Sequence, residues 1–211
     1  QGHYHHLLVA PVSLKSTVLH LMDREIAKGQ AGKIFIKINS LTDAEIIDKL
    51  SQASCAGVSV RMVIRGICCL LPGIPGKTEN IQISSVVGRY LEHSRIYCFG
   101  EGADEQMYIS SADFMTRNTE RRVEAACPIY DEKCRAKIHR IMETLEYDTR
   151  KARVLMADGS YVEKDQSREP LDSQQFLMAL AEQEAVRQEA APQPEGKKGG
   201  LFQALRRLLG R

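Results

Sequence analysis

The chain has 211 residues, of which 43% are hydrophobic, and a formal net charge of +2. These values favour one α/β domain with its own core and an additional segment. They exclude a protein that binds nucleic acid as a general polycation, so any anion site must be local. The apolar runs are too short for a transmembrane helix.

The start of the chain is polar and rich in histidine, which is unlike a secretory signal. Because the chain opens with Gln1 and its first methionine is Met22, we expect a piece of a longer protein, with residues 1–6 as a terminal extension. The six cysteines have no zinc-site spacing, so they are expected to be reduced thiols of a cytoplasmic protein.

Strands and helices are expected to alternate through residues 7–64. Apolar residues recur at every second position around Ile34 and Ile36, and at helical spacing in other segments. Thr42 is expected to cap the second helix, with Glu45 completing a capping box. The expected strands are 7–10, 33–39 and 58–64, and the expected helices are 13–28 and 42–57. This order predicts a mixed, mainly parallel sheet flanked by helices.

The next part of the chain is expected to add strands at 81–87, 94–99, 106–110 and 122–128. A short helix is expected at residues 88–92. Two apolar runs around the Gly-rich acidic turn 100–104 are typical of a hairpin. Asp131 is expected to cap a long helix that ends near residue 148. A small hairpin around Asp158-Gly159 would close the compact domain, which is expected to cover residues 7–163.

The composition becomes polar and charged after residue 163, so residues 164–211 are expected to form a flexible tail. A helix can form within it at 171–191, followed by a Pro- and Gly-containing linker. Residues 201–211 are short, basic and amphipathic, and could contact an anionic membrane surface or a groove on a partner.

Arg65 and His93 are the first candidate site residues. Ligands of open α/β sheets bind beyond the carboxyl ends of strands, and Arg65 lies at such an end. An arginine offers a permanently charged fork for phosphate oxygens, and a histidine can hold or donate a proton near neutral pH. Residue types alone leave open a surface ion pair for Arg65 and a partly buried, hydrogen-bonded role for His93.

Further arginines crowd the same region, among them Arg89, Arg95 and Arg117. They could line the path of a polyanion. They could equally form a solvated face paired with nearby glutamates. The pattern does not separate these two interpretations.

The segment His93-Ser-Arg95, followed by Ser110-Ser-Ala-Asp113, resembles a degenerate phospholipase D motif. That superfamily uses His-x-Lys, a later Asp and Gly-Ser-x-Asn, and two such half-sites meet. Here arginine replaces the lysine, Gly100 occupies the Asp spacing and Asp113 replaces the final asparagine. The chain carries one half-site only.

Five blocks of the chain carry a closer resemblance. They are Leu-Leu-Val-Ala-Pro at 7–11, Asp-Arg-Glu-Ile at 23–26, Val-Ile-Arg-Gly-Ile-Cys at 63–68, Arg-Tyr-Leu-Glu-His-Ser-Arg-Ile-Tyr at 89–97 and Ser-Ser-Ala-Asp-Phe-Met-Thr-Arg-Asn at 110–118. With these blocks, roughly residues 7–155 resemble the C-terminal catalytic domain of bacterial polyphosphate kinases.

The resemblance implies a phospholipase D-like fold and a role in moving the γ-phosphate of ATP reversibly onto polyphosphate through a phosphohistidine, with Mg²⁺. Arg65 matches the nucleotide-contacting arginine of the family, and His93 matches its second essential histidine. With this resemblance, Arg89, Arg95 and Arg117 could line the path of polyphosphate. The phosphorylated histidine and the arginines that contact magnesium would belong to a preceding domain, so no metal ligand is expected in this chain. The implied partners are ATP or ADP, polyphosphate, the upstream domains and a second copy of the enzyme. The implied location is the cytoplasm, with peripheral inner-membrane contact through residues 201–211.

Two other classes of function are compatible with the residues. One is a phospholipase D-like phosphodiesterase that works as a homodimer with one histidine from each subunit. The other is a non-catalytic module that binds polyanions.

Overall fold

The computed structural model describes residues 6–164, 167 and 169–190. Most of the expected terminal extension and the expected linker and basic segment after residue 190 lie outside these residues. The molecule divides into two compact units, Gln1–Phe176 and Leu177–Arg211. The first unit contains the sheet and the candidate site, and it continues past residue 163.

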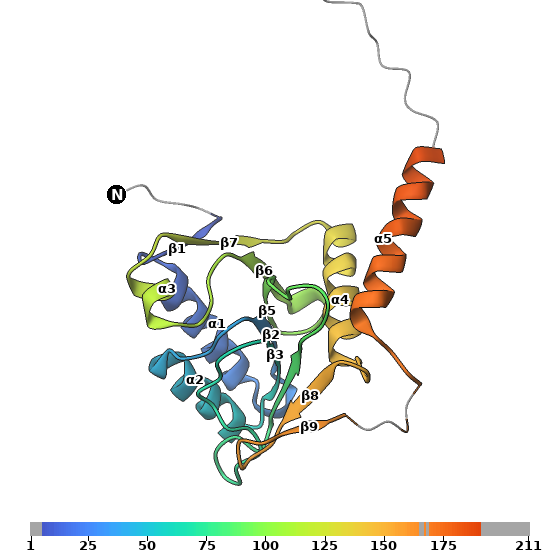
Figure 1. The fold of residues 1–211 in the computed structure, drawn as a ribbon. Coiled ribbons are helices and arrows are strands. Elements are labelled where there is room, and N and C mark those ends of the chain that lie inside the picture. Colours follow the sequence, from blue (N-terminus) through green and yellow to red (C-terminus); the bar gives the residue numbers. More distant parts are fainter. Residues whose placement is uncertain (1–5, 165–166, 168, 191–211) are drawn as a thin grey trace, which may run out of the picture. The chain divides into compact units, whose positions relative to one another are not determined.

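Nine strands within the described residues form one sheet (Figure 1). Their order across the sheet is β1-β7-β6-β5-β2-β3-β4-β8-β9. The strands are β1 (Leu8–Ala10), β2 (Lys33–Ile38), β3 (Ser59–Ile64), β4 (Ile81–Val86), β5 (Arg95–Phe99), β6 (Gln106–Ser110), β7 (Glu124–Pro128), β8 (Ala152–Leu155) and β9 (Tyr161–Glu163).

The mixed α/β class with flanking helices is confirmed, but the expectation of a mainly parallel sheet is wrong. Only the pairings β2–β3 and β3–β4 are parallel, and the other six are antiparallel. The connections between the strands explain this difference. Short links between β5, β6 and β7 reverse the chain direction, whereas the parallel β2–β3 pair has a helical crossover.

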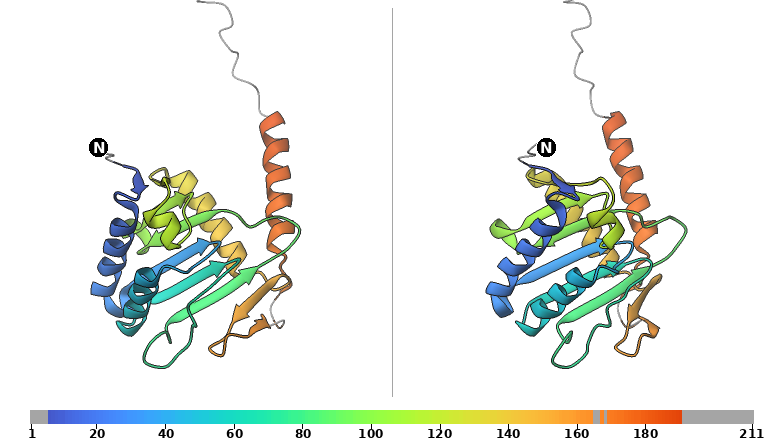
Figure 2. Two further views of the ribbon diagram at one scale, coloured as in Figure 1. Left: turned by 60° about the vertical axis from the view of Figure 1, so that its left-hand side comes forward. Right: turned by 90° about the vertical axis from the view of Figure 1, so that its left-hand side faces the viewer.

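Helices cover both faces of the sheet (Figure 2). The described helices of the chain are α1 (Leu14–Ala27), α2 (Ala44–Cys55), α3 (Thr116–Glu120), α4 (Glu132–Glu146) and α5 (Ser173–Ala190), with single 3-10 turns at Gly29–Ala31 and Gly102–Asp104. Helices α1 and α2 pack on one face against a cluster that includes Ile34 and Ile36. Helix α4 packs on the other face against Phe35 and Val63. No described helix is long and apolar enough to cross a membrane.

Both faces of β2 are covered, which explains why its residues are buried at consecutive positions. Side chains alternate between faces along a strand, so Ile36 points to the α1–α2 side and Lys37 to the α4 side. A lysine thus occupies a position that an apolar residue would be expected to fill.

Two local expectations are wrong. The helix at 88–92 does not form, and these residues have an irregular backbone. The cap of α2 is Asp43, whose carboxylate accepts from the N–H of Ile46, while the N–H of Thr42 donates to the carbonyl oxygen of Phe114. Backbone pairing with a distant segment therefore moves the start of the helix by one residue.

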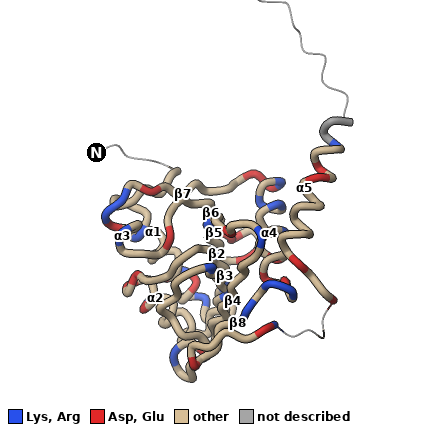
Figure 3. The backbone as a smooth tube through the Cα atoms, viewed as in Figure 1, with Lys and Arg blue, Asp and Glu red and all other residues tan. Residues whose placement is uncertain are grey.

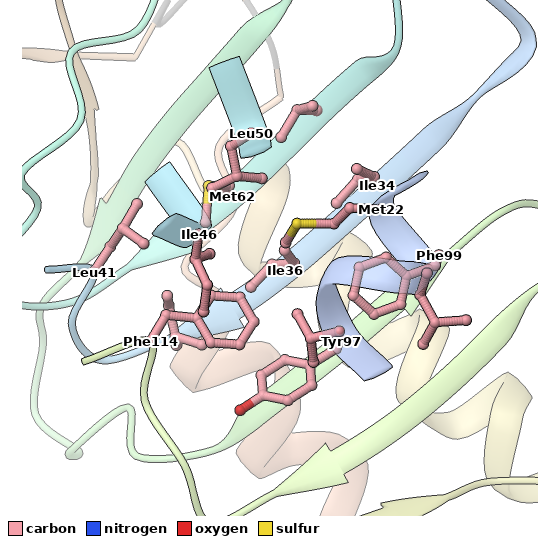
Figure 4. Packing of buried hydrophobic residues seen from close by; sticks show 14 of the residues in the cluster. Met22, Ile34, Ile36, Leu41, Ile46, Leu50, Met62, Tyr97, Phe99 and Phe114 are labelled. Carbon is pink, nitrogen blue, oxygen red and sulfur yellow. The ribbon is translucent and has the colours of Figure 1, made fainter. Parts of the chain in front are cut away.

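The turn after β6 is fixed in the core by Phe114. Its ring centroid lies 4.7 Å from that of Tyr97, and Figure 4 shows the two rings side by side. The hydroxyl of Tyr97 donates to the carbonyl oxygen of Ala112. The backbone oxygen of Phe114 also accepts the N–H groups of Thr42 and Asp43, at 2.8 and 3.0 Å. The position of this turn is thus determined by packing as well as by hydrogen bonds.

Substitution of Phe114 with alanine should therefore lower the free energy of unfolding by about 3–5 kcal/mol, because it leaves a cavity where a fully buried ring was. Urea unfolding followed by circular dichroism measures this change. Val123→Ala, at an 86% exposed position, is the control and should have little effect. Equal stability of the two variants would contradict the role given to Phe114.

Candidate functional site

The candidate site lies where several strand ends meet at one edge of the sheet. The carboxyl ends of β2 and β3 are adjacent because these strands are parallel. Strand β5 runs antiparallel to β2, so its first residues lie beside the last residues of β2. The end of β6 pairs with the start of β5, with Arg95 opposite Ser110. Arg65, His93, Arg95 and Asp113 are brought to this edge.

Asp113 is the hydrogen-bonding hub of the site. Its carboxylate accepts from the guanidinium of Arg95 at 3.3 and 3.0 Å, and from the backbone N–H groups of Asn39 and Ser40 at 2.7 and 3.3 Å. Burial raises the pKa of Asp113, but the bonds from Arg95 and Asn39 outweigh it and hold the pKa below its usual range. The carboxylate thus stays charged and fixes the plane of the Arg95 guanidinium.

Arg95 in turn orients His93. Its Nη1 donates to the backbone oxygen of His93 at 3.0 Å and lies 3.2 Å from Nδ1 of the ring. A guanidinium can only donate, so in the neutral ring Nδ1 accepts this bond and the proton lies on Nε2. The ring is exposed rather than partly buried. Nε2–H is therefore available to a ligand.

Arg65 is half-buried and held by an amide rather than a carboxylate. Its Nε donates to Oδ1 of Asn39 at 3.2 Å, and Nδ2 of Asn39 lies 3.4 Å from Asp113. Within the described residues Arg65 has no ion pair, so the surface ion pair left open by the residue types is not observed. The next residue, Gly66, allows close backbone approach, because a Cβ there would lie 2.9 Å from the oxygen of Asn39.

The sequence interpretation missed Lys37, which is only 1% exposed. Its ammonium donates to the backbone oxygens of Glu92 and Ser94, at 3.3 and 3.0 Å, which are the two carbonyls flanking His93. Its Nζ lies 3.7 Å from the Glu92 carboxylate. Burial lowers the pKa of Lys37 to about 8. Glu92 opposes this shift, whereas the nearby charges of Arg65 and Arg95 add to it. The signal that could have identified it is a lysine within the apolar run of β2.

The other two candidate arginines are exposed and are not bonded to this group. The guanidinium of Arg89 lies over the ring of Tyr90, 5.3 Å from its centroid. Arg117 is on the surface of α3. Around α3 and along α4, basic and acidic positions are interspersed (Figure 3). The positive charge of the site is therefore local, and the assignment of Arg89, Arg95 and Arg117 to a polyphosphate path stays a prediction.

A cavity of about 230 Å³ adjoins Arg65 and Gly66. Its lining adds two basic residues from around β8, Lys151 and Arg153, and contains no acidic residue. Arg153 also pairs with Glu163, with 2.5 Å between the nearest atoms. Such a cavity favours an anion.

The donor set does not fit a magnesium ion. No group of three or more His, Cys, Asp or Glu side chains among the described residues is placed to hold a metal. Mg²⁺ prefers carboxylate and water oxygens, whereas basic side chains predominate at this edge of the sheet. The described residues at this edge therefore offer no ligand set that suits Mg²⁺.

The lowered pKa of Lys37 gives a pH dependence of stability. Unfolded lysine keeps its proton up to about pH 10.5, whereas folded Lys37 releases it near pH 8. The unfolded state thus binds more protons between these values, and the free energy of unfolding should rise with pH there relative to Lys37→Met. Urea unfolding of both proteins at pH 7.5 and pH 10 measures the difference. If the free energy of unfolding changed with pH in the same way in both proteins, the lowered pKa of Lys37 would be contradicted.

Comparisons with known proteins agree with the sequence resemblance. Residues 7–175 match the family described as Polyphosphate kinase C-terminal domain 2. A polyphosphate kinase of Bacillus cereus is 47% identical over 185 residues, which are 86% of this chain and 26% of that protein. The chain thus spans roughly a quarter of the length of the curated relatives it matches.

Solved structures agree with the fold. The crystal structure of polyphosphate kinase from Porphyromonas gingivalis matches with a TM-score of 0.81 and 36% identity, over 86% of this chain and 28% of that one. Nuc from Salmonella typhimurium, a phospholipase D family member, matches with a TM-score of 0.51 at 17% identity, over 71% of this chain and 96% of that one. The second match concerns the fold alone, and the expected phospholipase D-like fold is confirmed. The sequence match and the fold together establish that the chain belongs to the polyphosphate kinase C-terminal domain 2 family.

Proposed function

We propose that this chain supplies one half of a phosphoryl-transfer site, in an enzyme that moves the γ-phosphate of ATP reversibly onto inorganic polyphosphate. The observation that carries the proposal is the arrangement of Arg65, His93 and Arg95 at one sheet edge, where Asp113 is the one described carboxylate that pairs with them directly. A phosphate group bound there would meet a free guanidinium end and an imidazole N–H.

The chemistry follows from this arrangement. Phosphoryl transfer needs positioning and charge stabilisation more than covalent help from many groups. Arg65 would bind nucleotide phosphate oxygens, and Nε2–H of His93 would donate to the transferring group or the leaving oxygen. The nucleophile would be a histidine of a preceding domain. In the forward direction its nitrogen forms the P–N bond as the bond to ADP breaks, and the terminal oxygen of polyphosphate then displaces the histidine.

The other components of the reaction belong to the proposal as well. Mg²⁺ would neutralise phosphate charge when bound by upstream residues, and it requires no ligand from this chain. ATP or ADP, polyphosphate, the upstream domains and a second copy of the enzyme are the proposed partners. A cytoplasmic location is proposed too. Contact of residues 201–211 with the inner membrane stays a prediction outside the described residues.

A phosphodiesterase that works as a homodimer receives less support from the site. The residue two positions after the histidine is Arg95, and its guanidinium is engaged by Asp113 on two of its nitrogens. Simple polyanion binding is the stronger alternative, since the cavity beside Arg65 would suit it. Binding of polyphosphate by a complete enzyme that shows no kinase activity would favour that alternative.

In the complete kinase, His93→Ala and Arg65→Ala should each reduce polyphosphate synthesis by about 10²-fold or more, because His93→Ala removes a donor to the transferring group or leaving oxygen and Arg65→Ala removes the contact to the nucleotide phosphates. Synthesis from ATP is measured at saturating substrate, with circular dichroism as a check on folding. Arg187→Ala, on α5, is the matched control and should leave turnover unchanged. Near-normal turnover of the His93 or Arg65 variant would contradict the assignment.

The isolated chain should not become phosphorylated by ATP, since the nucleophilic histidine is expected in a preceding domain. The measurement is incubation with γ-labelled ATP followed by detection of acid-labile label on the protein. Appreciable incorporation, absent from the His93→Ala variant, would make His93 the nucleophile and overturn the division of roles.

A further inference from the structure

The segment that carries His93 is held by residues far away in the sequence. Residues 87–94, between β4 and β5, form neither helix nor strand. The backbone N–H of Tyr90 donates to Oε1 of Gln174 at 2.9 Å, and Nε2 of Gln174 donates to the backbone oxygen of Tyr90 at 2.8 Å. Nε2 also donates to the carboxylate of Glu92 at 2.8 Å. The side-chain amide of Gln174 thus bonds both backbone groups of Tyr90, which in a helix at 88–92 would have bonded within the segment.

Gln174 is itself firmly placed. It is 6% exposed, although it belongs to the first turn of α5. The preceding residue, Ser173, donates from its N–H and its hydroxyl to the carboxylate of Asp148, at 2.8 and 2.6 Å. Asp148 is fully buried and also accepts three consecutive backbone N–H groups, those of residues 150–152. The start of α5 is therefore anchored to the loop before β8.

Lys37 holds the same segment from the sheet. It donates to the carbonyls of Glu92 and Ser94, while the carboxylate of Glu92 lies between Gln174 and Lys37. His93 is thus flanked by two fixed peptide groups, and Arg95 holds its ring. Of the three residues that hold this segment, Lys37 and Arg95 lie in strands, whereas Gln174 lies in α5.

Gly88 provides an independent observation on the same contact. A Cβ added there would lie 2.5 Å from Oε1 of Gln174. The backbone of Gly88 does not have a positive φ angle, so an alanine is not excluded by backbone strain. A side chain at position 88 is instead excluded by the amide of Gln174, which occupies the space that a Cβ would need.

We propose that Gln174 is a positioning residue of the phosphate site, which fixes the segment 88–92 so that the imidazole of His93 meets the phosphoryl group. This inference rests on the proposed function of His93. It makes the first turn of α5 a part of the site, although the sequence placed it in a tail. Gln174 does not touch the substrate and acts through the backbone of Tyr90 and the side chain of Glu92.

The first test is the kinetics of the complete kinase carrying Gln174→Ala. Loss of positioning should lower kcat about 10- to 100-fold and change the KM for ATP much less, because the lost contact matters most in the transition state. Gln174→Glu should not restore activity, since a carboxylate cannot donate to Tyr90 and Glu92. Gln175→Ala, at the exposed neighbouring position, is the matched control and should behave as wild type.

The second test uses Gly88→Ala, alone and with Gln174→Ala. In the wild-type background the added methyl group displaces the amide of Gln174, so kcat should fall by a similar factor. In the Gln174→Ala background the space is free, and the added methyl group should cost little. Such non-additivity is expected when two changes remove one contact. Additive effects would overturn the proposal.

A third measurement does not depend on activity. Amide hydrogen exchange of the chain carrying Gln174→Ala should be faster at residues 88–93 and unchanged in β2, β3 and β5. Faster exchange throughout the sheet would mean a merely structural role and would overturn the proposal.

The kinetic results distinguish failure of the proposed function from failure of the positioning role. If His93→Ala turns over normally, the proposed function fails. If His93→Ala is inactive but Gln174→Ala equals Gln175→Ala, only the positioning role fails. Should Gln174→Ala not fold, Gly88→Ala provides the same comparisons.

Discussion

The contact between Asp113 and Arg95 is the interaction on which the rest of the site depends. Asp113 accepts the N–H groups that follow β2, and it holds the guanidinium at the start of β5 in one plane. It thereby joins the ends of three strands, since Asp113 itself lies just after β6. A buried ion pair is costly unless its remaining hydrogen-bonding groups are satisfied, and here backbone amides and His93 satisfy them. Asp113 and its hydrogen bonds therefore favour one arrangement of the strand ends.

The charge balance explains why this edge suits phosphate. Burial lowers the pKa of Lys37, and the nearby charges of Arg65 and Arg95 lower it further. Among the described residues, the carboxylates that oppose these three cations are Asp113 and Glu92. A cluster of cations with too few carboxylates is unfavourable by itself, and a bound anion relieves the repulsion. Arg65 is held by an amide rather than a carboxylate, which leaves its charge for a ligand. The described part of the chain thus presents an excess of positive charge at a place determined by the ends of the strands.

Much of the fold could be predicted from local sequence patterns. The β5–β6 hairpin, the Asp131 cap of α4 and the small β8–β9 hairpin follow from patterns that act within a few residues. The mostly antiparallel sheet could not be predicted, because strand direction depends on which distant strands become neighbours. Strand β1 pairs with β7, which lies more than one hundred residues further along the chain. The missing helix at 88–92 has the same kind of cause, since the distant Gln174 pairs with the backbone N–H and oxygen of Tyr90.

For the site, the sequence by itself determined the residue types and the family blocks, and so identified Arg65 and His93 as candidates. It also supplied Arg95 and Asp113, although not the fact that they bind each other. Only the tertiary structure decided which charges are compensated, that Lys37 is buried beneath His93, and that Gln174 reaches the same segment. The physical reason is distance along the chain. Residues 37, 93, 113 and 174 have no local pattern in common, and they meet because the sheet edge and the first turn of α5 bring their hydrogen-bonding groups together.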